Sequence, residues 1–291
     1  MVAALALVDG SEIVVKVHRW NVTLERLVAV QRVQALLADA GLPAPRPLMD
    51  PCPLGKGIAT AEEMLSGQSA DAGHRSVRKA IAVALHRFIR ATTDISVIEA
   101  LGAPLVLRPL DAPLWPEPHE VRLDFEATAD GAEWIDDLAM AARQRLQAAG
   151  DDVVVGHFDW RVENLGFAGR RVVAIYDWDS VCVAPEAVVV GNTAAQFTVD
   201  WSRGEPDPLP SLGEMRSFVD DYEQARGRRF SSSEWEQLDA ANLALCTYGA
   251  RCQHSDTKLH PVIGSSSDNR WIRLLRERGE QWSIGPRILD S

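Results

Sequence analysis

Residues 153–180 read VVVGHFDWRVENLGFAGRRVVAIYDWDS, and this stretch decides the fold and the chemistry that the sequence predicts. The apolar run at 153–155 predicts a short buried strand. A second strand-like run covers 171–176, and the glycine-containing connection at 168–170 favours a hairpin before it. Five polar side chains follow these runs: His157, Asp159, Asn164, Asp177 and Asp179.

The hairpin predicts a metal site at one end of its strands. If Phe167 pairs with Arg171, Asn164 falls roughly opposite Ala174, and Asp177 lies just beyond on the same rim. One amide oxygen and one carboxylate would then reach the same cation. Mg²⁺ prefers such a sparse set of oxygen ligands, completed by water and substrate phosphates.

Asp159 precedes Asn164 by five residues, so a loop can hold its carboxylate near that cation. A carboxylate in this place suits a base that orients a substrate hydroxyl. The plainer interpretation is structural: His157 and Asp159 cap turns, while Asp177 and Asp179 solvate the end of a strand.

The pattern HxDxxxxN, followed by a strand and an aspartate, resembles the catalytic core of the aminoglycoside phosphotransferase and choline kinase family, relatives of the protein kinases. His157, Asp159, Asn164 and residues 175–179 carry the resemblance. It implies that Asp159 is the catalytic base and that Asn164 and Asp177 hold Mg²⁺. His157 belongs to the same catalytic loop, where we expect it to brace the backbone near Asp177.

Residues 3–18 contain two apolar runs around Asp9-Gly10, which predicts a β-hairpin. Lys16 lies in the second strand. The resemblance implies that this lysine grips the α- and β-phosphates of the nucleotide, whereas alternation alone makes it the solvent-facing half of a strand. The family carries another strand and a phosphate-covering loop before this hairpin, so we expect a shortened N-terminal lobe.

Residues 23–40 predict an amphipathic helix. The family carries a glutamate in this helix that pairs with the strand lysine, but the corresponding position falls near Val30. Glu25 is then the remaining candidate partner of Lys16, although a carboxylate at a helix start also has the simpler role of stabilising the helix.

Residues 57–67 resemble the family's connection between lobes, in which a strand ends in an acid, two apolar residues and a glycine. The resemblance implies that the backbone of Glu63, Met64 and Leu65 meets the adenine ring. A plain exit from a strand into a loop explains the same residues equally well.

The rest of the chain predicts helices near 74–93, 132–149, 187–199, 212–226, 231–253 and 267–280. Residues 95–131 are rich in proline and form a long irregular connection that suits part of a substrate rim. Acidic side chains of the C-terminal helices either line a pocket for a cation or form solvated faces; they are Asp220, Asp221, Glu223, Glu234, Glu236 and Asp239.

Composition narrows the possible partners. The net charge is −11 and the pI about 5.1, which argues against a general nucleic-acid binder. An acidic surface suits a cationic small molecule as substrate, or serves solubility alone. The four cysteines have no zinc-type spacing and indicate reduced thiols in a cytosol. No apolar run spans a membrane and no signal peptide is recognised, so we expect a cytoplasmic protein without membrane partners.

These observations predict an α+β, protein kinase-like two-lobe fold. Residues 1–67 would form a small, β-rich nucleotide lobe with the connection, and 68–291 a larger, mainly helical catalytic and substrate-binding lobe. The expected activity is transfer of the γ-phosphate of ATP, with GTP left open, to a hydroxyl of an aminoglycoside-like molecule, sugar or amino alcohol. Two alternatives stay open: a weak or inactive relative that binds a nucleotide or a partner, and a metal-dependent hydrolase using His157, Asp159 and Asp177.

Overall fold

The computed structural model describes residues 1–18, 22–92, 98–147, 152–204, 208–261 and 270–285. These residues form two compact units, and each is described here by itself. Unit 1 contains Met1–Gly102 and Val154–Val183, and unit 2 contains Ala103–Val153 and Ala184–Ser291. The predicted catalytic stretch therefore groups with the N-terminal sheet. The predicted lobe boundary at residue 67 stays a prediction.

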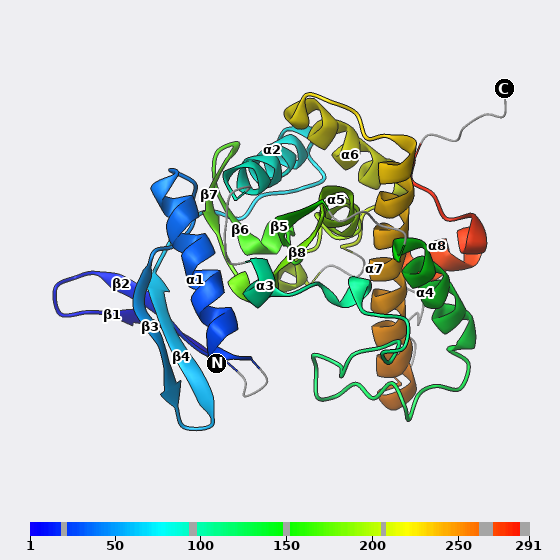
Figure 1. Cartoon of the computed structure of the whole chain (residues 1–291), viewed down its shortest axis with the longest axis horizontal. Coiled ribbons are helices and arrows are strands. Elements are labelled where there is room, and N and C mark those ends of the chain that lie inside the picture. The colour runs from blue at the N-terminus through cyan, green and yellow to red at the C-terminus, as the bar shows by residue number, and fades with distance from the viewer. Residues whose placement is uncertain (19–21, 93–97, 148–151, 205–207, 262–269, 286–291) are drawn as a thin grey trace. The chain divides into compact units, whose positions relative to one another are not determined.

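Unit 1 is built on an antiparallel sheet of four strands in the order β1-β2-β4-β3 (Figure 1). The strands are β1 (Val2–Ala6), β2 (Glu12–His18), β3 (Pro47–Leu54) and β4 (Gly57–Glu63). Asp9 and Gly10 make the β1–β2 turn: the Asp9 carboxylate accepts from the Ser11 N–H at 2.9 Å, and Gly10 has φ +85°. The predicted N-terminal hairpin is confirmed.

Helix α1 (Leu24–Asp39) runs along the sheet (Figure 1). It starts where predicted, because the Thr23 hydroxyl accepts a hydrogen bond from the Arg26 N–H at 3.2 Å. Leu27, Val33 and Leu37 are buried on one stripe of the helix, as its amphipathic pattern requires. Helix α1 therefore packs its apolar side on the sheet, and its polar side chains lie next to this apolar stripe.

The rest of unit 1 supports the predicted catalytic stretch. It contains α2 (Arg75–Ala91), α3 (Ile98–Leu101), β5 (Val153–His157), β6 (Leu165–Ala168), β7 (Arg171–Ile175) and β8 (Val181–Pro185), whose ends at Val153, Ala184 and Pro185 belong to unit 2. Strands β6 and β7 form the predicted hairpin, and α2 packs on β7. Helix α2 is amphipathic, with Ile81, Leu85 and Phe88 buried.

The predicted register of the β6–β7 hairpin was wrong. Phe167 pairs with Val172 instead of Arg171, and a β-bulge between Gly166 and Phe167 shifts the pairing again toward the open end. The Tyr176 N–H consequently donates to the Asn164 carbonyl oxygen at 2.9 Å. A bulge adds one residue to one strand, and no pattern in the sequence marks it. The change places Asn164 closer along the ladder to Asp177 than predicted.

Unit 2 is helical. Its helices are α4 (Glu133–Leu146), α5 (Glu186–Ala194), α6 (Leu212–Arg226), α7 (Ser232–Leu259) and α8 (Arg270–Arg278). Helices α4 and α5 pack on α7, the longest of them. Capping boxes start α6 and α7, formed by Ser211 with Glu214 and by Ser231 with Glu234.

The predicted helices are present within the described residues, with some different ends. Helix α5 stops at Ala194 instead of 199, and α7 continues to Leu259 instead of 253. Residues 98–131 are irregular as predicted, apart from α3 and one turn at Leu105–Leu107. Residues 93–97 and 262–269, where two predicted elements begin, lie outside the described residues.

Acidic side chains in α6 and α7 serve the packing of unit 2. Glu234 pairs with Arg226 at 2.8 Å and caps α7, and Asp220 pairs with Arg216 at 3.1 Å. Asp239 is buried and accepts the Ile284 N–H at 2.8 Å. The predicted cationic pocket lined by these acids therefore gains no support from them.

Two further expectations concern surfaces and thiols. No helix in the described part of the chain is long and apolar enough to cross a membrane. Cys52, Cys182, Cys246 and Cys252 are free thiols, as expected from their spacing.

The close packing of α5 on α7 gives a test of the fold. A methyl group added at Gly191 would lie 2.2 Å from the backbone oxygen of Leu238. We expect Gly191→Ala to lower the free energy of unfolding by about 2 kcal/mol, because rigid backbone must move apart. Gly213 in α6 has no neighbour within 4 Å of such a group, so Gly213→Ala should be neutral or stabilising. Equal urea-denaturation midpoints for the two variants would contradict this packing.

Candidate active site

His157 ends β5 and is fully buried. Its Nδ1 lies 3.3 Å from the Asp159 N–H nitrogen, which is a donor, so Nδ1 accepts and the proton resides on Nε2. Nε2 then donates to the Tyr176 carbonyl oxygen at 3.0 Å. The bracing bond predicted for His157 is therefore present, one residue before Asp177.

Aromatic rings close the space around His157. Phe88, Trp160 and Trp178 meet it edge-on, with ring centroids 5.6 to 6.5 Å away. Burial lowers the pKa of His157, so the neutral imidazole is favoured. A side chain that is sealed from solvent and bonded at both nitrogens positions the loop and does not touch a substrate.

Asp159 is held by its neighbours in the loop. The Asn164 Nδ2 donates to the Asp159 carbonyl oxygen at 2.9 Å and to its carboxylate at 2.7 Å. Arg161 forms an ion pair with the other carboxylate oxygen at 3.2 Å. Because the nitrogen of Asn164 is used on Asp159, the amide oxygen of Asn164 is left as a ligand for a cation.

Asp177 has an unusual backbone. Among the described residues it is the only non-glycine residue with a positive φ, at +55°. Such a conformation is uncommon and costs free energy, so its presence at a candidate site suggests a functional constraint. Its carboxyl group stays open to solvent, but nearby protein removes part of its hydration and raises its pKa, and the charges of Asp179 and Asp159 add to this.

The donor set fits a hard divalent cation. Asn164 offers an amide oxygen and Asp177 a carboxylate, and the backbone bond from Tyr176 to Asn164 ties their segments together. A cation would also relieve the repulsion among the carboxylates that raises the pKa of Asp177. Among the described residues no group of three or more His, Cys, Asp and Glu side chains could hold a metal ion, so phosphate oxygens and water would complete the shell.

Asp179 is fixed from the sheet and from α1. His18, buried at the end of β2, places its Nδ1 3.3 Å from the Asp179 carboxylate, and its Nε2 lies 2.9 Å from the Thr60 hydroxyl. Arg26 donates to the backbone oxygens of Asp179 and Val181, each at 3.0 Å. The sequence did not predict the contacts of His18 and Arg26 with Asp179, since each joins residues more than 150 positions apart.

Lys16 pairs with Glu62 on β4 at 3.1 Å, and the two side chains are only 12% and 13% exposed. Of the two roles that the sequence left open for Glu25, the pairing with Lys16 is therefore wrong, and Glu25 lies in the first turn of α1 as the simpler role requires. Glu62 is held in turn by Gln34 of α1, whose Nε2 donates to the second carboxylate oxygen at 2.7 Å. The acid that pairs with Lys16 thus comes from the sheet and not from the helix.

The register of the sheet explains this pair. Lys16 lies opposite Thr60, and Glu62 is two residues further along β4, on the same face. Strands β2 and β4 are separated in sequence by α1 and β3, so their register cannot be derived from local pattern. Val30 is buried in α1, as the sequence indicated for the position of the missing helix acid.

The connection after β4 lies directly on the β6–β7 hairpin. Gln68 and Phe167 exchange two backbone hydrogen bonds of 2.8 and 2.9 Å. Gly67 and Gly166 allow this approach, because a methyl group added at Gly67 would lie 2.5 Å from the Gly166 Cα. The segment predicted to meet adenine is therefore fixed to the strand pair that bears Asn164.

Three residues of the connection were predicted to offer their backbone to adenine. The Glu63 N–H donates to Arg46 at 2.9 Å and the Met64 N–H to Glu12 at 3.2 Å, so both are occupied. The Leu65 carbonyl accepts from the Tyr176 hydroxyl at 3.4 Å. The Leu65 N–H has no partner among the described residues, which leaves it as the donor available to a ligand.

Comparison with known proteins now identifies the class. Residues 4–240 match the family described as "Phosphotransferase enzyme family". The chain belongs to this family, and the resemblance to the aminoglycoside phosphotransferases is confirmed. It is a small-molecule kinase that acts on an alcohol group. A search of curated proteins gives no match.

Solved structures share the predicted kinase-like α+β fold. An aminoglycoside phosphotransferase from Alicyclobacillus acidocaldarius has 14% identity and a TM-score of 0.56, with 95% of this chain and 85% of that chain covered. An ethanolamine kinase from Plasmodium vivax has 12% identity and a TM-score of 0.52, with 94% and 79% covered. A thermostable aminoglycoside phosphotransferase mutant, solved with ADP and hygromycin B, has 14% identity and a TM-score of 0.51, with 89% and 88% covered.

The Lys16–Glu62 pair predicts a loss of nucleotide affinity when its acid is removed. We expect Glu62→Gln to weaken Mg-nucleotide binding about tenfold, because Lys16 loses the charge that orients it. Glu25→Gln is the matched control and should bind as the wild type does. Isothermal titration of both variants decides the point, and an equal loss in Glu25→Gln would restore the rejected pairing.

The neutral, buried His157 predicts a pH dependence of stability. Its pKa is lowered on folding, so below about pH 6.5 the unfolded chain binds a proton that the folded chain does not. Stability should therefore fall as the pH drops below about 6.5. We expect His157→Gln to be less stable but to show a shallower decline in urea-melt free energies. The exposed His260, changed to Gln, is the control and should keep the wild-type slope.

Proposed function

We propose that this protein transfers the γ-phosphate of ATP to a hydroxyl group of a small molecule, with Asp159 as base. One observation carries the proposal. The amide nitrogen of Asn164 donates to the Asp159 carboxylate, which leaves the amide oxygen to bind a cation together with Asp177, whose backbone is strained. A phosphotransferase needs such positioning and charge neutralisation more than covalent chemistry.

Asp159 is the proposed base. Its carboxylate is partly exposed, and the hydrogen bond from Asn164 and the ion pair with Arg161 fix its direction. It would accept a hydrogen bond from the acceptor hydroxyl and align the oxygen with the γ-phosphorus. His157 contributes by holding the Asp159 backbone and the Tyr176 carbonyl in one arrangement.

The nucleotide would be held by residues of the same unit. Asn164 and Asp177 would hold Mg²⁺, which when bound neutralises charge on the β- and γ-phosphates. Lys16, oriented by Glu62, would neutralise the α- and β-phosphates. The free Leu65 N–H would donate to the adenine ring, and GTP remains an alternative co-substrate.

The acceptor is proposed to be an aminoglycoside-like molecule, a sugar or an amino alcohol. Structural neighbours are named as an ethanolamine kinase, a macrolide phosphotransferase and an aminoglycoside phosphotransferase bound to hygromycin B. A cationic acceptor suits the net charge of −11. We propose a cytoplasmic enzyme without nucleic-acid or membrane partners for this reaction.

Two alternatives are weaker. A weak or inactive relative would not need the hydrogen bond between Asn164 and the Asp159 carboxylate, or the backbone bond that ties Asn164 to the segment of Asp177. A hydrolase with His157 as ligand is disfavoured, because this imidazole is buried and both of its nitrogens have partners.

Substitution of the base tests the proposal. We expect Asp159→Ala to lower turnover by a factor of at least about 10², the usual contribution of a positioned base. Binding of Mg-ATP, measured by thermal shift, should survive. Asp177→Ala should lose turnover and the Mg-dependent part of nucleotide binding together.

The control is Asp152→Ala, which removes an exposed carboxylate near the start of β5. This variant should keep the wild-type binding of Mg-ATP. It should also keep the wild-type turnover in assays of phosphate transfer to a panel of amino alcohols, sugars and aminoglycosides. Full activity of Asp159→Ala with any acceptor would show that Asp159 is not the base.

A further inference from the structure

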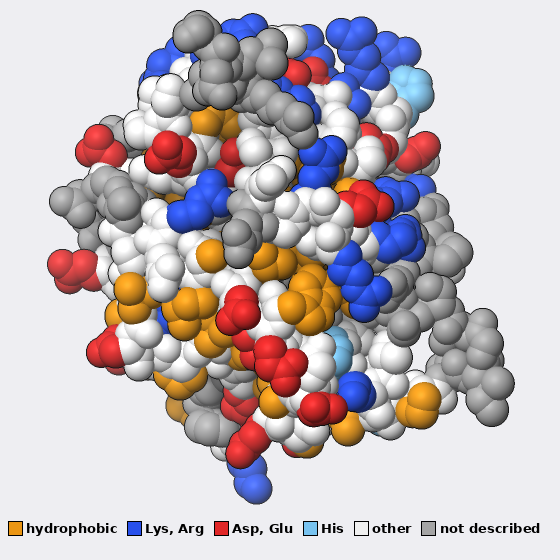
Figure 2. Space-filling view, turned by 90° about the vertical axis from the view of Figure 1, so that its right-hand side faces the viewer, with side chains coloured by type: hydrophobic (Ala, Val, Ile, Leu, Met, Phe, Trp, Pro, Cys, Tyr) orange, Lys and Arg blue, Asp and Glu red, His pale blue; other side chains and the backbone are white. Residues whose placement is uncertain are grey.

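Charge is distributed unevenly on this acidic protein. On the face shown in Figure 2, acidic and basic side chains are interspersed. Helix α2 differs from such a mixture, because its 17 residues include four arginines and a lysine but no aspartate or glutamate. Although the whole chain has a net charge of −11, this helix contains only basic charged residues.

The β6–β7 hairpin extends this basic surface. Residues 165–176 contain Arg170 and Arg171 and no acid, and β7 packs on α2. Arg87 of α2, Arg170 and Arg171 are all exposed. None of the three guanidinium groups has a hydrogen bond or ion pair to another described residue. By contrast, the side chains of Arg26, Arg46 and Arg161 of the same unit each form a hydrogen bond or an ion pair.

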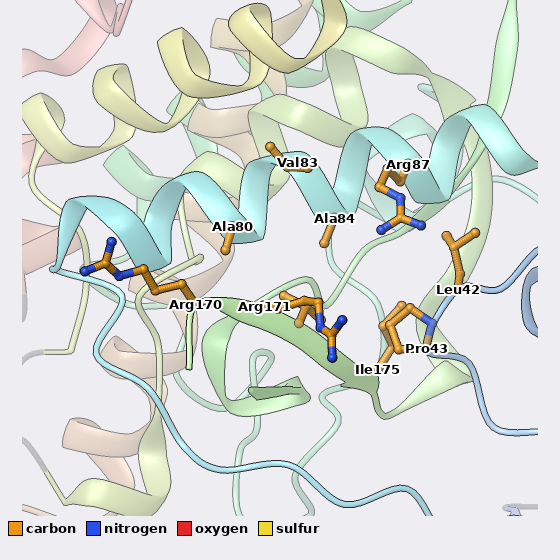
Figure 3. A pocket seen from close by; sticks show the side chains of 10 residues that line it. Leu42, Pro43, Ala80, Val83, Ala84, Arg87, Arg170, Arg171 and Ile175 are labelled. Carbon is orange, nitrogen blue, oxygen red and sulfur yellow. The ribbon is translucent and has the colours of Figure 1, made fainter. Parts of the chain in front are cut away.

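The three arginines line a pocket of about 100 Å³ together with aliphatic side chains and a proline. One stripe of α2 lines it, namely Ala80, Val83, Ala84 and Arg87, at the spacing of a single helix face. Leu42, Pro43 and Ile175 form the opposite wall. Figure 3 shows the guanidinium groups of Arg87 and Arg171 beside Pro43 and Ile175, whereas Arg170 lies at the other end of the pocket.

The size of the pocket restricts the ligand. Sites for whole small molecules occupy about 300–1,000 Å³, so a pocket of about 100 Å³ takes a single group. The group must be apolar to suit alanine, valine and leucine walls, and it must be joined to anions to suit the arginines. An aliphatic side chain flanked by carboxylates meets both requirements.

We propose that this surface of α2 and the β6–β7 hairpin binds an acidic peptide segment of a partner protein. A leucine-type side chain would fill the pocket between Ala80, Ala84 and Pro43. Carboxylates on either side of it would pair with Arg87 and Arg171, for which arginine is well suited through its paired donors. The inference is independent of the proposed phosphotransfer, since none of these residues belongs to the catalytic set.

A nucleic acid is the other polyanion that arginines attract. Its binding depends on phosphates and on bases that stack on aromatic rings. The lining of this pocket contains no aromatic side chain, and its residues other than the arginines are aliphatic or proline. The peptide is therefore favoured, and single-stranded RNA serves as the competing probe.

The experiment uses the full chain and a fluorescent decapeptide of Asp and Glu residues around one central Leu. Fluorescence anisotropy at low ionic strength should show saturable micromolar binding that weakens with added salt. Replacing the central Leu of the peptide by Ser should weaken binding at least tenfold. Arg87→Glu and Arg171→Glu should each do the same.

The matched control is Arg32→Glu, an equal charge reversal at an exposed arginine of α1, which should leave peptide affinity unchanged. All variants should keep the wild-type melting temperature and phosphotransferase rate. Three results would overturn the proposal: no saturable binding of the Leu peptide, equal binding of the Leu and Ser peptides, or tighter binding of the RNA with the same dependence on Arg87 and Arg171.

Discussion

The hydrogen bond from the His157 imidazole to the Tyr176 carbonyl is the contact on which the site depends. One ring joins the loop that bears Asp159 to the strand end that bears Asp177, and the Asp159 N–H bonds its other nitrogen. The aromatic cage excludes water, so the bond competes with no solvent and the ring keeps one tautomer. The buried histidine costs stability at low pH, and it fixes two acids whose mutual repulsion would otherwise separate them.

A second layer of contacts joins the sheet to this loop within unit 1. His18 reaches Asp179, and Arg26 holds the backbone on both sides of Ser180. Gln68 and Phe167 connect the segment after β4 to the hairpin. Each contact links residues that are far apart in the sequence. Strain at Asp177 is therefore maintained by a surrounding structure that fixes its neighbours on both sides.

Local pattern was sufficient for most of the helices and strands and for the hydrogen bond that His157 makes in the predicted catalytic stretch. The hairpin at Asp9-Gly10, the start of α1 at Thr23 and the brace at His157 follow from turn chemistry, capping and a resemblance. The failures are non-local. Glu62 could not be assigned to Lys16 because the β2–β4 register is set by tertiary packing, and the bulge at Gly166 moved Asn164 relative to its partner strand. The net charge of the whole chain gave no sign of the basic surface, because Arg87 and Arg171 come together only in the folded structure.

The placement of Glu62 affects how this enzyme can be regulated. In a kinase whose phosphate-binding lysine pairs with an acidic residue on a helix, an outward movement of that helix breaks the ion pair and inactivates the enzyme. Here lysine and acid belong to neighbouring strands of one sheet, and in the part of the chain that the structure describes α1 donates a hydrogen bond to the pair from the neutral amide of Gln34. Rotation of α1 would break the Gln34 bond and the bonds from Arg26 to Asp179 and Val181, but lysine and acid would stay on the same sheet. If Lys16 serves the nucleotide as proposed, an outward swing of α1 would not switch this ion pair, and the output of the enzyme would follow the supply of substrate and the amount of protein made.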